Sequence, residues 1–289
     1  MKFLRFFLTL LIFIPILNSC TRSDHLMKIM SFNIRYDNPA DSLNSWAHRR
    51  DMIVILINTH KPDVIGTQEA LYHQIEYLEQ NLPEYNWIGV GRDDGHRGGE
   101  FTAIFYNKDR LKILTDSSFW LSPTPPEPGP GWDASLNRTV TWAKFRDSFS
   151  GRQFFLFNTH FDHEGEIARI ESARLLLRKM TETFGNLPII LTGDFNSVPE
   201  SEPYQVLTST KEETLTRKLF DSRLISQKTP AGPIGTFTGF DLEADPKQPI
   251  DYIFVSNKIN VANYAVLADK FEGRFPSDHF PVLIKIAFE

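Results

Sequence analysis

Residues 189–196 read IILTGDFN, a short apolar run that ends in an aspartate and an asparagine. An apolar run bounded in this way is typical of a buried strand. Similar junctions between apolar and polar residues occur at four more places in the chain: 64–69, 154–160, 250–252 and 277–282. Because strands can bring their ends to one edge of a sheet, we expect these five clusters of acidic, amide and imidazole side chains to form a single site.

Around these clusters the apolar pattern alternates between strand-like and helix-like stretches, which indicates an α/β protein. The clearest helix is predicted over 165–185, where Ile170, Ala173 and Leu177 share one face and Gly185 is placed to end it. Strands are predicted at 101–106, 139–145, 154–157 and 189–191. The proline-rich segment 122–131 is expected to be an ordered loop. Without internal repeats or a linker, one domain is favoured over two.

Composition excludes several kinds of protein. The chain has 289 residues, is 41% hydrophobic, and carries one cysteine and a net charge of −5. A single cysteine rules out an intramolecular disulfide framework and a zinc site built from several thiolates. The acidic balance disfavours a nucleic-acid binder that depends on a basic stripe, but it leaves phosphate chemistry open. The most basic cluster, His48-Arg49-Arg50, is expected on the solvated face of an early helix.

The first twenty residues resemble an export signal. Lys2 and Arg5 precede an apolar run over 6–17, and Cys20 follows directly after a short polar close. The position of Cys20 is that of a lipidated first residue of a bacterial lipoprotein; the alternative is an ordinary signal peptide with a cysteine nearby. We therefore expect an exported protein that is lipid-anchored in the cell envelope if its source is bacterial. The expected organisation is a signal peptide at 1–19, a short tether at 20–27 and one folded domain at 28–289.

Six motifs along the chain carry a family resemblance: SFNIR at 31–35, Gln68-Glu69, Asn158-Thr159-His160, GDFN at 193–196, Ile250-Asp251-Tyr252 and Ser277-Asp278-His279. Their identity and order resemble the endonuclease/exonuclease/phosphatase superfamily, also called DNase I-like, and in particular its secreted or lipoprotein bacterial branch. That resemblance implies a four-layered α/β sandwich, in which two packed mixed sheets are flanked by helices. It also implies phosphoester hydrolysis.

Phosphoester hydrolysis needs a hard cation, an in-line water and donors for the phosphate oxygens. Carboxylate and amide oxygens suit Mg²⁺ or Mn²⁺, so Glu69 is the expected principal ligand, with Asn33 beside it. By resemblance, Asp194 and Asn196 orient or activate the attacking water. The resemblance also assigns Asp278 an assisting part in metal binding.

Two carboxylate–imidazole pairs are expected from the resemblance. Asp251 is expected to fix the tautomer of His279, and Glu100 is expected to pair with His160. Which pair supplies the base and which the acid stays open. Arg138, just before a predicted strand, matches the arginine that grips phosphate in the family, together with Asn33; the alternative is a surface charge at a strand start.

The residues of the predicted site are compatible with several classes of phosphoester substrate. We expect a monomeric, Mg²⁺-dependent phosphatase or phosphodiesterase that acts on a small or carbohydrate-linked phosphate. A nuclease, a sphingomyelinase-like phospholipid phosphodiesterase and a binding protein without activity are the alternatives. Trp120 and Trp132 are expected either to stack on a substrate ring or to anchor the proline-rich loop, and the segment 89–99 is expected to form the opposite wall.

Overall fold

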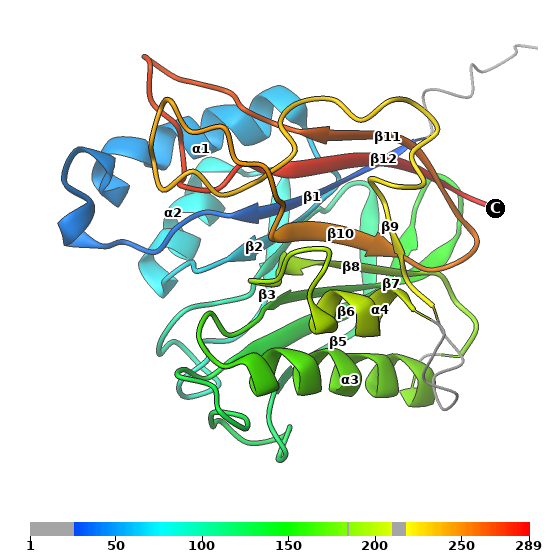
Figure 1. The fold of residues 1–289 in the computed structure, drawn as a ribbon. Coiled ribbons are helices and arrows are strands. Elements are labelled where there is room, and N and C mark those ends of the chain that lie inside the picture. Colours follow the sequence, from blue (N-terminus) through cyan, green and yellow to red (C-terminus); the bar gives the residue numbers. More distant parts are fainter. Residues whose placement is uncertain (1–25, 184, 210–217) are drawn as a thin grey trace, which may run out of the picture.

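The computed structural model describes residues 26–183, 185–209 and 218–289, and these form two stacked sheets with helices on both outer sides (Figure 1). The predicted signal peptide and Cys20 lie outside the described residues. Helices α1 and α2 cover one sheet and α3 and α4 cover the other, so the layers run helix, sheet, sheet, helix. This is the predicted four-layered α/β sandwich of two mixed sheets.

The first sheet is built mainly from the two ends of the chain. Its strands are β1 (Met27–Asn33), β2 (Val64–Gln68), β3 (Tyr85–Ile88), β4 (Ile104–Asn107), β11 (Ile259–Val266) and β12 (Val282–Phe288). They lie in the order β11-β12-β1-β2-β4-β3. Only β1 and β2 run parallel within this sheet, so both strands end at the same edge, with Asn33 opposite Gln68.

The second sheet repeats this plan with the middle of the chain. Its strands are β5 (Leu111–Trp120), β6 (Thr139–Asp147), β7 (Gln153–His160), β8 (Ile189–Asp194), β9 (Phe220–Asp221) and β10 (Asp251–Val255). They lie in the order β5-β6-β7-β8-β10-β9. Here β7 and β8 are the parallel pair, with His160 opposite Asp194, and β10 starts at that edge with Asp251 opposite Asp194.

The helix predicted at 165–185 is present as α3 (Glu166–Thr183), whereas α4 (Glu202–Thr208) was not predicted. The other helices are α1 (Trp46–His60) and α2 (Tyr72–Asn81), with a short 3-10 segment at Pro39–Asn44. Gly185 adopts a φ of 53° just beyond α3, a conformation that glycine accepts without steric cost. Within the described ranges, no helix combines the length and apolar character needed to cross a membrane.

The space between the sheets changes in character along the strands. Most of it is an apolar core in which Ile29, Phe145 and Ile284 are fully buried. Near the edge where β1, β2, β7 and β8 end, the buried side chains between the sheets are polar. Gln68 donates a hydrogen bond to Asn158 Oδ1 at 2.7 Å, and the side chain of Asn158 donates to the carbonyl of Thr67 at 2.8 Å. These bonds tie the two sheets together directly beneath the polar edge.

Candidate active site

All five polar clusters meet at this edge of the sandwich, as the sequence predicts. Asn33 ends β1 and Glu69 follows β2. His160 and Asp194 end β7 and β8, Asp251 opens β10, and Asp278 and His279 lead toward β12. Several residues here have left-handed backbone conformations, which residues other than glycine rarely adopt. They are Arg35 at φ 58°, Glu69 at φ 67° and Asn196 at φ 45°. Such strain persists only where the surroundings enforce it, and it concentrates at functional sites.

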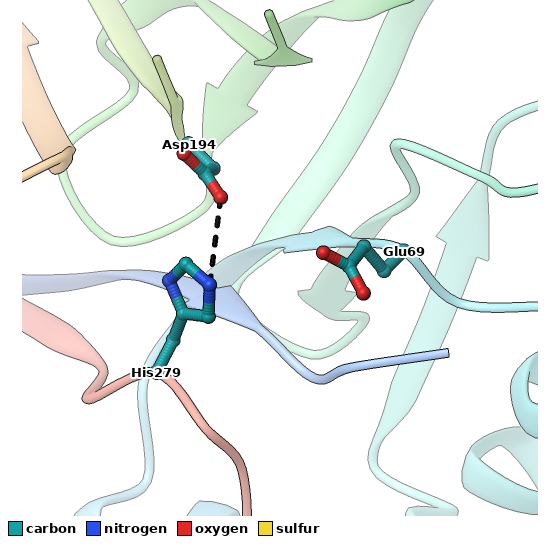
Figure 2. Close-up of side chains that lie close together, drawn as sticks. All are labelled: Glu69, Asp194 and His279. Carbon is teal, nitrogen blue, oxygen red and sulfur yellow. Dashed lines mark ion pairs between the residues drawn. The ribbon is translucent and has the colours of Figure 1, made fainter. Parts of the chain in front are cut away.

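The centre of the edge is a cluster of Glu69, Asp194 and His279, which come from three separate parts of the chain (Figure 2). One ligand atom from each lies within 4.8 Å of the others. Asn33 links the two carboxylates, because its side-chain nitrogen donates to Glu69 Oε1 at 2.8 Å and to Asp194 Oδ2 at 2.9 Å. Two acidic groups from different sheets are thereby aimed at one point.

Asp251 and His279 form the predicted pair. His279 Nδ1 lies 2.8 Å from Asp251 Oδ2, which leaves Nε2 directed at the centre, 3.7 Å from Asp194 Oδ2. Burial alone would lower the pKa of His279, but the carboxylates of Asp251 and Asp194 outweigh it and raise the pKa well above the ordinary value. Burial and the nearby Asp251 raise the pKa of Asp194 to about 7.

His160 and Glu100 lie on the other side of Asp194, in a looser arrangement than the prediction implies. His160 Nδ1 is 4.0 Å from Glu100 Oε2, whereas Arg92 reaches the same oxygen at 2.6 Å. Asn196 contacts His160 Nε2 at 3.1 Å. Burial raises the pKa of Glu100 to about 7 despite Arg92, and burial together with Arg138 and Arg92 lowers the pKa of His160 well below its ordinary value. Glu100 is therefore shared between a guanidinium and an imidazole.

Arg138 lies at the mouth of β6 as predicted, and it is buried rather than a surface charge. Its Nε donates to Asp162 at 3.2 Å and one terminal nitrogen contacts His163 Nδ1 at 2.9 Å. The other terminal nitrogen, Nη1, is buried and has no hydrogen-bond partner. Asp162 itself accepts hydrogen bonds from the backbone of Ser135, Glu164 and Gly165, so the guanidinium is held on a rigid support.

Asp278 lies on the flank of the cluster, beside Arg35. Arg35 forms a two-point contact with Asp41 at 3.0 and 3.1 Å and lies 3.7 Å from Asp278 and 3.9 Å from Glu69. Burial raises the pKa of Asp278. Arg35 thus balances part of the negative charge that Asp278 and Glu69 bring to the edge.

These groups open into one cavity of about 840 Å³. Its lining combines charged groups on the floor with apolar side chains on the walls: Arg35, Tyr36, Asp41, Glu69, Arg92, Glu100, Leu136, Arg138, His160, His163, Asp194, Asn196, Phe237, Gly239, Phe240, Ile250, Asp278 and His279. The segment 89–99 contributes Arg92, as expected for the opposite wall. Neither Trp120 nor Trp132 lines the cavity. Trp120 donates its indole N–H to the carbonyl of Arg92 at 2.7 Å and thereby anchors the wall that Arg92 belongs to.

Three polar residues in or behind the lining of the cavity have no counterpart among the predicted site residues: Asp162, His163 and Arg49. Asp162 and His163 belong to no recognisable motif, and only their position directly after His160 in the chain could have suggested them. Arg49 was expected on a solvated helix face, and this prediction is wrong. His48 and Arg50 are exposed, but Arg49 is only 1% exposed, because this side of α1 packs against the loop that follows β1.

The Endonuclease/Exonuclease/phosphatase family model matches residues 30–279, which include every motif of the site. The chain belongs to this family. Membership places it among phosphoester hydrolases, in agreement with the predicted reaction class. Among solved structures, a mannosyl-6-phosphatase of Bacteroides thetaiotaomicron is 40% identical with a TM-score of 0.85, and the match covers 91% of this chain and 100% of that one.

Other relatives agree on the fold. A family protein of Bacteroides vulgatus is 39% identical with a TM-score of 0.85, and the match covers 91% of this chain and 99% of that structure. Nocturnin of Drosophila melanogaster is 25% identical over 282 residues, which are 85% of this chain and 42% of nocturnin. The chain therefore spans less than half the length of this curated relative.

The residues at the centre fit a hard divalent cation, as is usual in this family. Glu69 and Asp194 offer carboxylate oxygens within reach of a common point, and both are largely withdrawn from solvent. Burial and the nearby carboxylate of Asp251 raise the pKa of Asp194, so a negative charge at this position is unfavourable without a cation. His279 Nε2 completes the cluster geometrically.

Proposed function

We propose that this protein is a metal-dependent phosphatase that removes a phosphate group from a small sugar-linked phosphomonoester. The observation that carries the proposal is the cavity itself. Its floor joins a carboxylate pair suited to a divalent cation with an arginine that keeps one buried nitrogen free of partners, and its walls are apolar and aromatic. A site of this kind binds an anionic group at its floor and a ring against its walls.

A divalent cation bound here, Mg²⁺ or Mn²⁺, would supply Lewis-acid chemistry: it would neutralise phosphate charge and polarise the phosphoryl group. Glu69 would hold the cation, Asn33 orients both carboxylates, and Asp278 adds negative charge at the flank. Arg138, held by Asp162 and His163, provides donors to phosphate oxygens.

Asp194 and Asn196 direct the attacking water. Asp194 lies between the two imidazoles, 3.6 Å from His160 Nε2 and 3.7 Å from His279 Nε2, and the backbone N–H of Asn196 donates to its other oxygen at 3.0 Å. Such a carboxylate can accept a proton from water while the charged ring of His279, fixed by Asp251, stabilises negative charge on the phosphoryl group. Glu100 and His160 supply a second route for a proton near the leaving group.

Three observations support a sugar phosphate over a longer substrate. The cavity of about 840 Å³ is of the size that encloses a small ligand. The net charge of −5 does not favour tracking along nucleic acid. The mannosyl-6-phosphatase that resembles this chain over 91% of its length acts, by its name, on a phosphorylated sugar.

The test is a substrate comparison with purified protein in Mg²⁺ or Mn²⁺. We expect hydrolysis of hexose 6-phosphates to exceed that of a phosphodiester, sphingomyelin and single-stranded DNA. EDTA is expected to abolish turnover, and Glu69→Gln, which keeps the shape of the side chain and removes its charge, is expected to reduce kcat by at least about a hundredfold. Preferred turnover of DNA or sphingomyelin would show that the substrate class is wrong.

We further propose that the protein is exported and anchored through a lipid on Cys20. The basic start, the apolar run at 6–17 and the position of the only cysteine support this proposal. Cys20→Ser is expected to move the protein from the membrane fraction to the soluble fraction of a bacterial host that processes lipoproteins. Unchanged fractionation would contradict the anchor.

A further inference from the structure

A buried arginine on α1 stands behind the candidate metal site. Arg49 is 1% exposed, and among the described residues its hydrogen bonds go to backbone carbonyls rather than to carboxylates. Burial lowers its pKa to about 10, so the guanidinium remains charged at neutral pH. A buried charge with this bonding pattern is costly unless every donor is satisfied.

The carbonyls that Arg49 binds belong to the loop that follows β1. Its nitrogens donate to Ile34, Arg35 and Tyr36 in that loop, and the bonds to Arg35 and Tyr36 measure 2.6 and 3.1 Å. Further bonds reach the carbonyls of Asn44 at 2.9 Å and Pro276 at 3.5 Å. One side chain therefore gathers the loop after β1, the turn before α1 and the segment that leads to Asp278 and His279.

The backbone of this loop holds the side chains of the metal site in place. The N–H of Arg35 donates to Asn33 Oδ1 at 3.0 Å, and the N–H of Tyr36 donates to Glu69 Oε2 at 3.2 Å. Arg35, which lies between these two N–H···O bonds, adopts a φ of 58°. That conformation is unfavourable for arginine and requires support from outside the loop.

A second buried side chain, on α2, supports the same loop. Gln74 is fully buried, donates to the carbonyl of Arg35 at 3.0 Å and accepts from the N–H of Asp37 at 2.9 Å. The carbonyl of Arg35 thus receives one hydrogen bond from each helix that covers the first sheet. Arg49 and Gln74 form what we call the loop clamp.

We propose that Arg49, assisted by Gln74, is a positioning residue for the metal site: it fixes the loop 34–37 so that Asn33 and Glu69 are held for a divalent cation. The inference rests on the proposed metal-dependent function. Lysine cannot take over this part, because a single ammonium cannot reach carbonyls spread around a planar guanidinium fork. Partners that orient metal ligands commonly account for about 10- to 100-fold in metal affinity.

The test compares Mn²⁺ affinity, measured by isothermal titration without substrate, in wild-type protein, Arg49→Lys and Arg110→Lys. Arg110 is the matched control, because it is a buried arginine that pairs with Asp63 and Asp147 near the opposite ends of β1 and β2. We expect Arg49→Lys to weaken Mn²⁺ binding by about 10- to 100-fold. Arg110→Lys is expected to lower the thermal midpoint but leave the Mn²⁺ Kd within twofold of wild type.

Wild-type Mn²⁺ affinity in folded Arg49→Lys would overturn the inference, and so would equal weakening in both lysine variants. If Arg49→Lys fails to fold, Gln74→Met decides the question: a Kd raised several-fold supports the loop clamp and an unchanged Kd refutes it. Failure of the proposed function looks different, because the wild type would then bind Mn²⁺ without hydrolysing any phosphoester offered.

Discussion

Arg138 and Asp162 form one buried unit beside the cavity. The carboxylate of Asp162 accepts hydrogen bonds from the backbone N–H groups of Ser135 and Gly165 and lies 3.2 Å from the Nε of Arg138. Both side chains are withdrawn from solvent, so each charge depends on the other for its compensation. Loss of the carboxylate would leave the guanidinium of Arg138 buried without its charged partner.

Asp162 leads to a prediction about stability and substrate binding. Burial would raise its pKa, but hydrogen bonds from Gly165 and Ser135 and the charge of Arg138 lower it below the ordinary value. A carboxyl group whose pKa is lowered in the folded state stabilises the protein at pH values above its pKa in the unfolded state. This contribution is lost as the pH falls toward the pKa of the folded state. Asp162→Asn is therefore expected to lower the free energy of unfolding by about 3 kcal/mol at pH 7.

Urea unfolding at pH 7 and pH 3 measures this effect, and the difference between variant and wild type should shrink at the lower pH. Asp162→Asn should also raise KM more than it lowers kcat, because Arg138 loses the group that orients it. A difference in unfolding free energy that grows on acidification would show that another group dominates. Glu127→Gln, at an exposed carboxylate of the proline-rich loop, is the control and should change neither quantity.

At the scale of elements, periodicity located the main strands and helices but not their partners. Strands β7 and β8 lie where apolar runs predict them, and α3 ends beside Gly185 as expected. The pairing of β1 with β12, which sets Met27 opposite Ile286, joins segments at the two ends of the described chain. No local pattern encodes such a pairing, because it depends on packing against the whole sandwich.

Gly66 in β2 gives a prediction for the contact between the sheets. A Cβ at this position would lie 2.2 Å from Thr192 Oγ1 and 2.5 Å from Asn158 Oδ1, so Gly66→Ala must push β2 away from β7 and β8. We expect a loss of about 1–3 kcal/mol in unfolding free energy. Turnover should also fall, since Glu69 follows β2 and would move with it. Gly129→Ala, where the added carbon meets open space, is the control for urea unfolding and kcat; equal effects of both substitutions would contradict the steric argument.

For the whole molecule, the site joins two halves that resemble each other in plan. Each sheet contributes the ends of its parallel pair, β1 and β2 from one and β7 and β8 from the other, and Asn33 bridges from Glu69 to Asp194 across the gap. The junctions between apolar runs and polar side chains predicted this convergence, and Glu69, Asp194 and His279 meet in one cluster as expected. Arg49 did not follow its prediction, because helical periodicity reports which face of a helix is apolar and does not report a loop that packs over a polar position. The depth of the cavity and the identity of its walls depend on the loops, whose course the sequence did not reveal.

Because the carboxylates come from both sheets, cation binding should stabilise the entire sandwich. A ligand that binds only the folded state adds about 2.7 kcal/mol at one hundred times its Kd, which for a domain of this size is about 5–10 °C in thermal midpoint. We expect Mg²⁺ and Mn²⁺ to raise the midpoint in calorimetry in a concentration-dependent manner, and EDTA to reverse the increase. Glu69→Gln should remove most of the shift, whereas Glu164→Gln, at an exposed carboxylate outside the cation cluster, should retain it. A shift of equal size in both variants would place the cation elsewhere, because the bridge between the sheets requires Glu69.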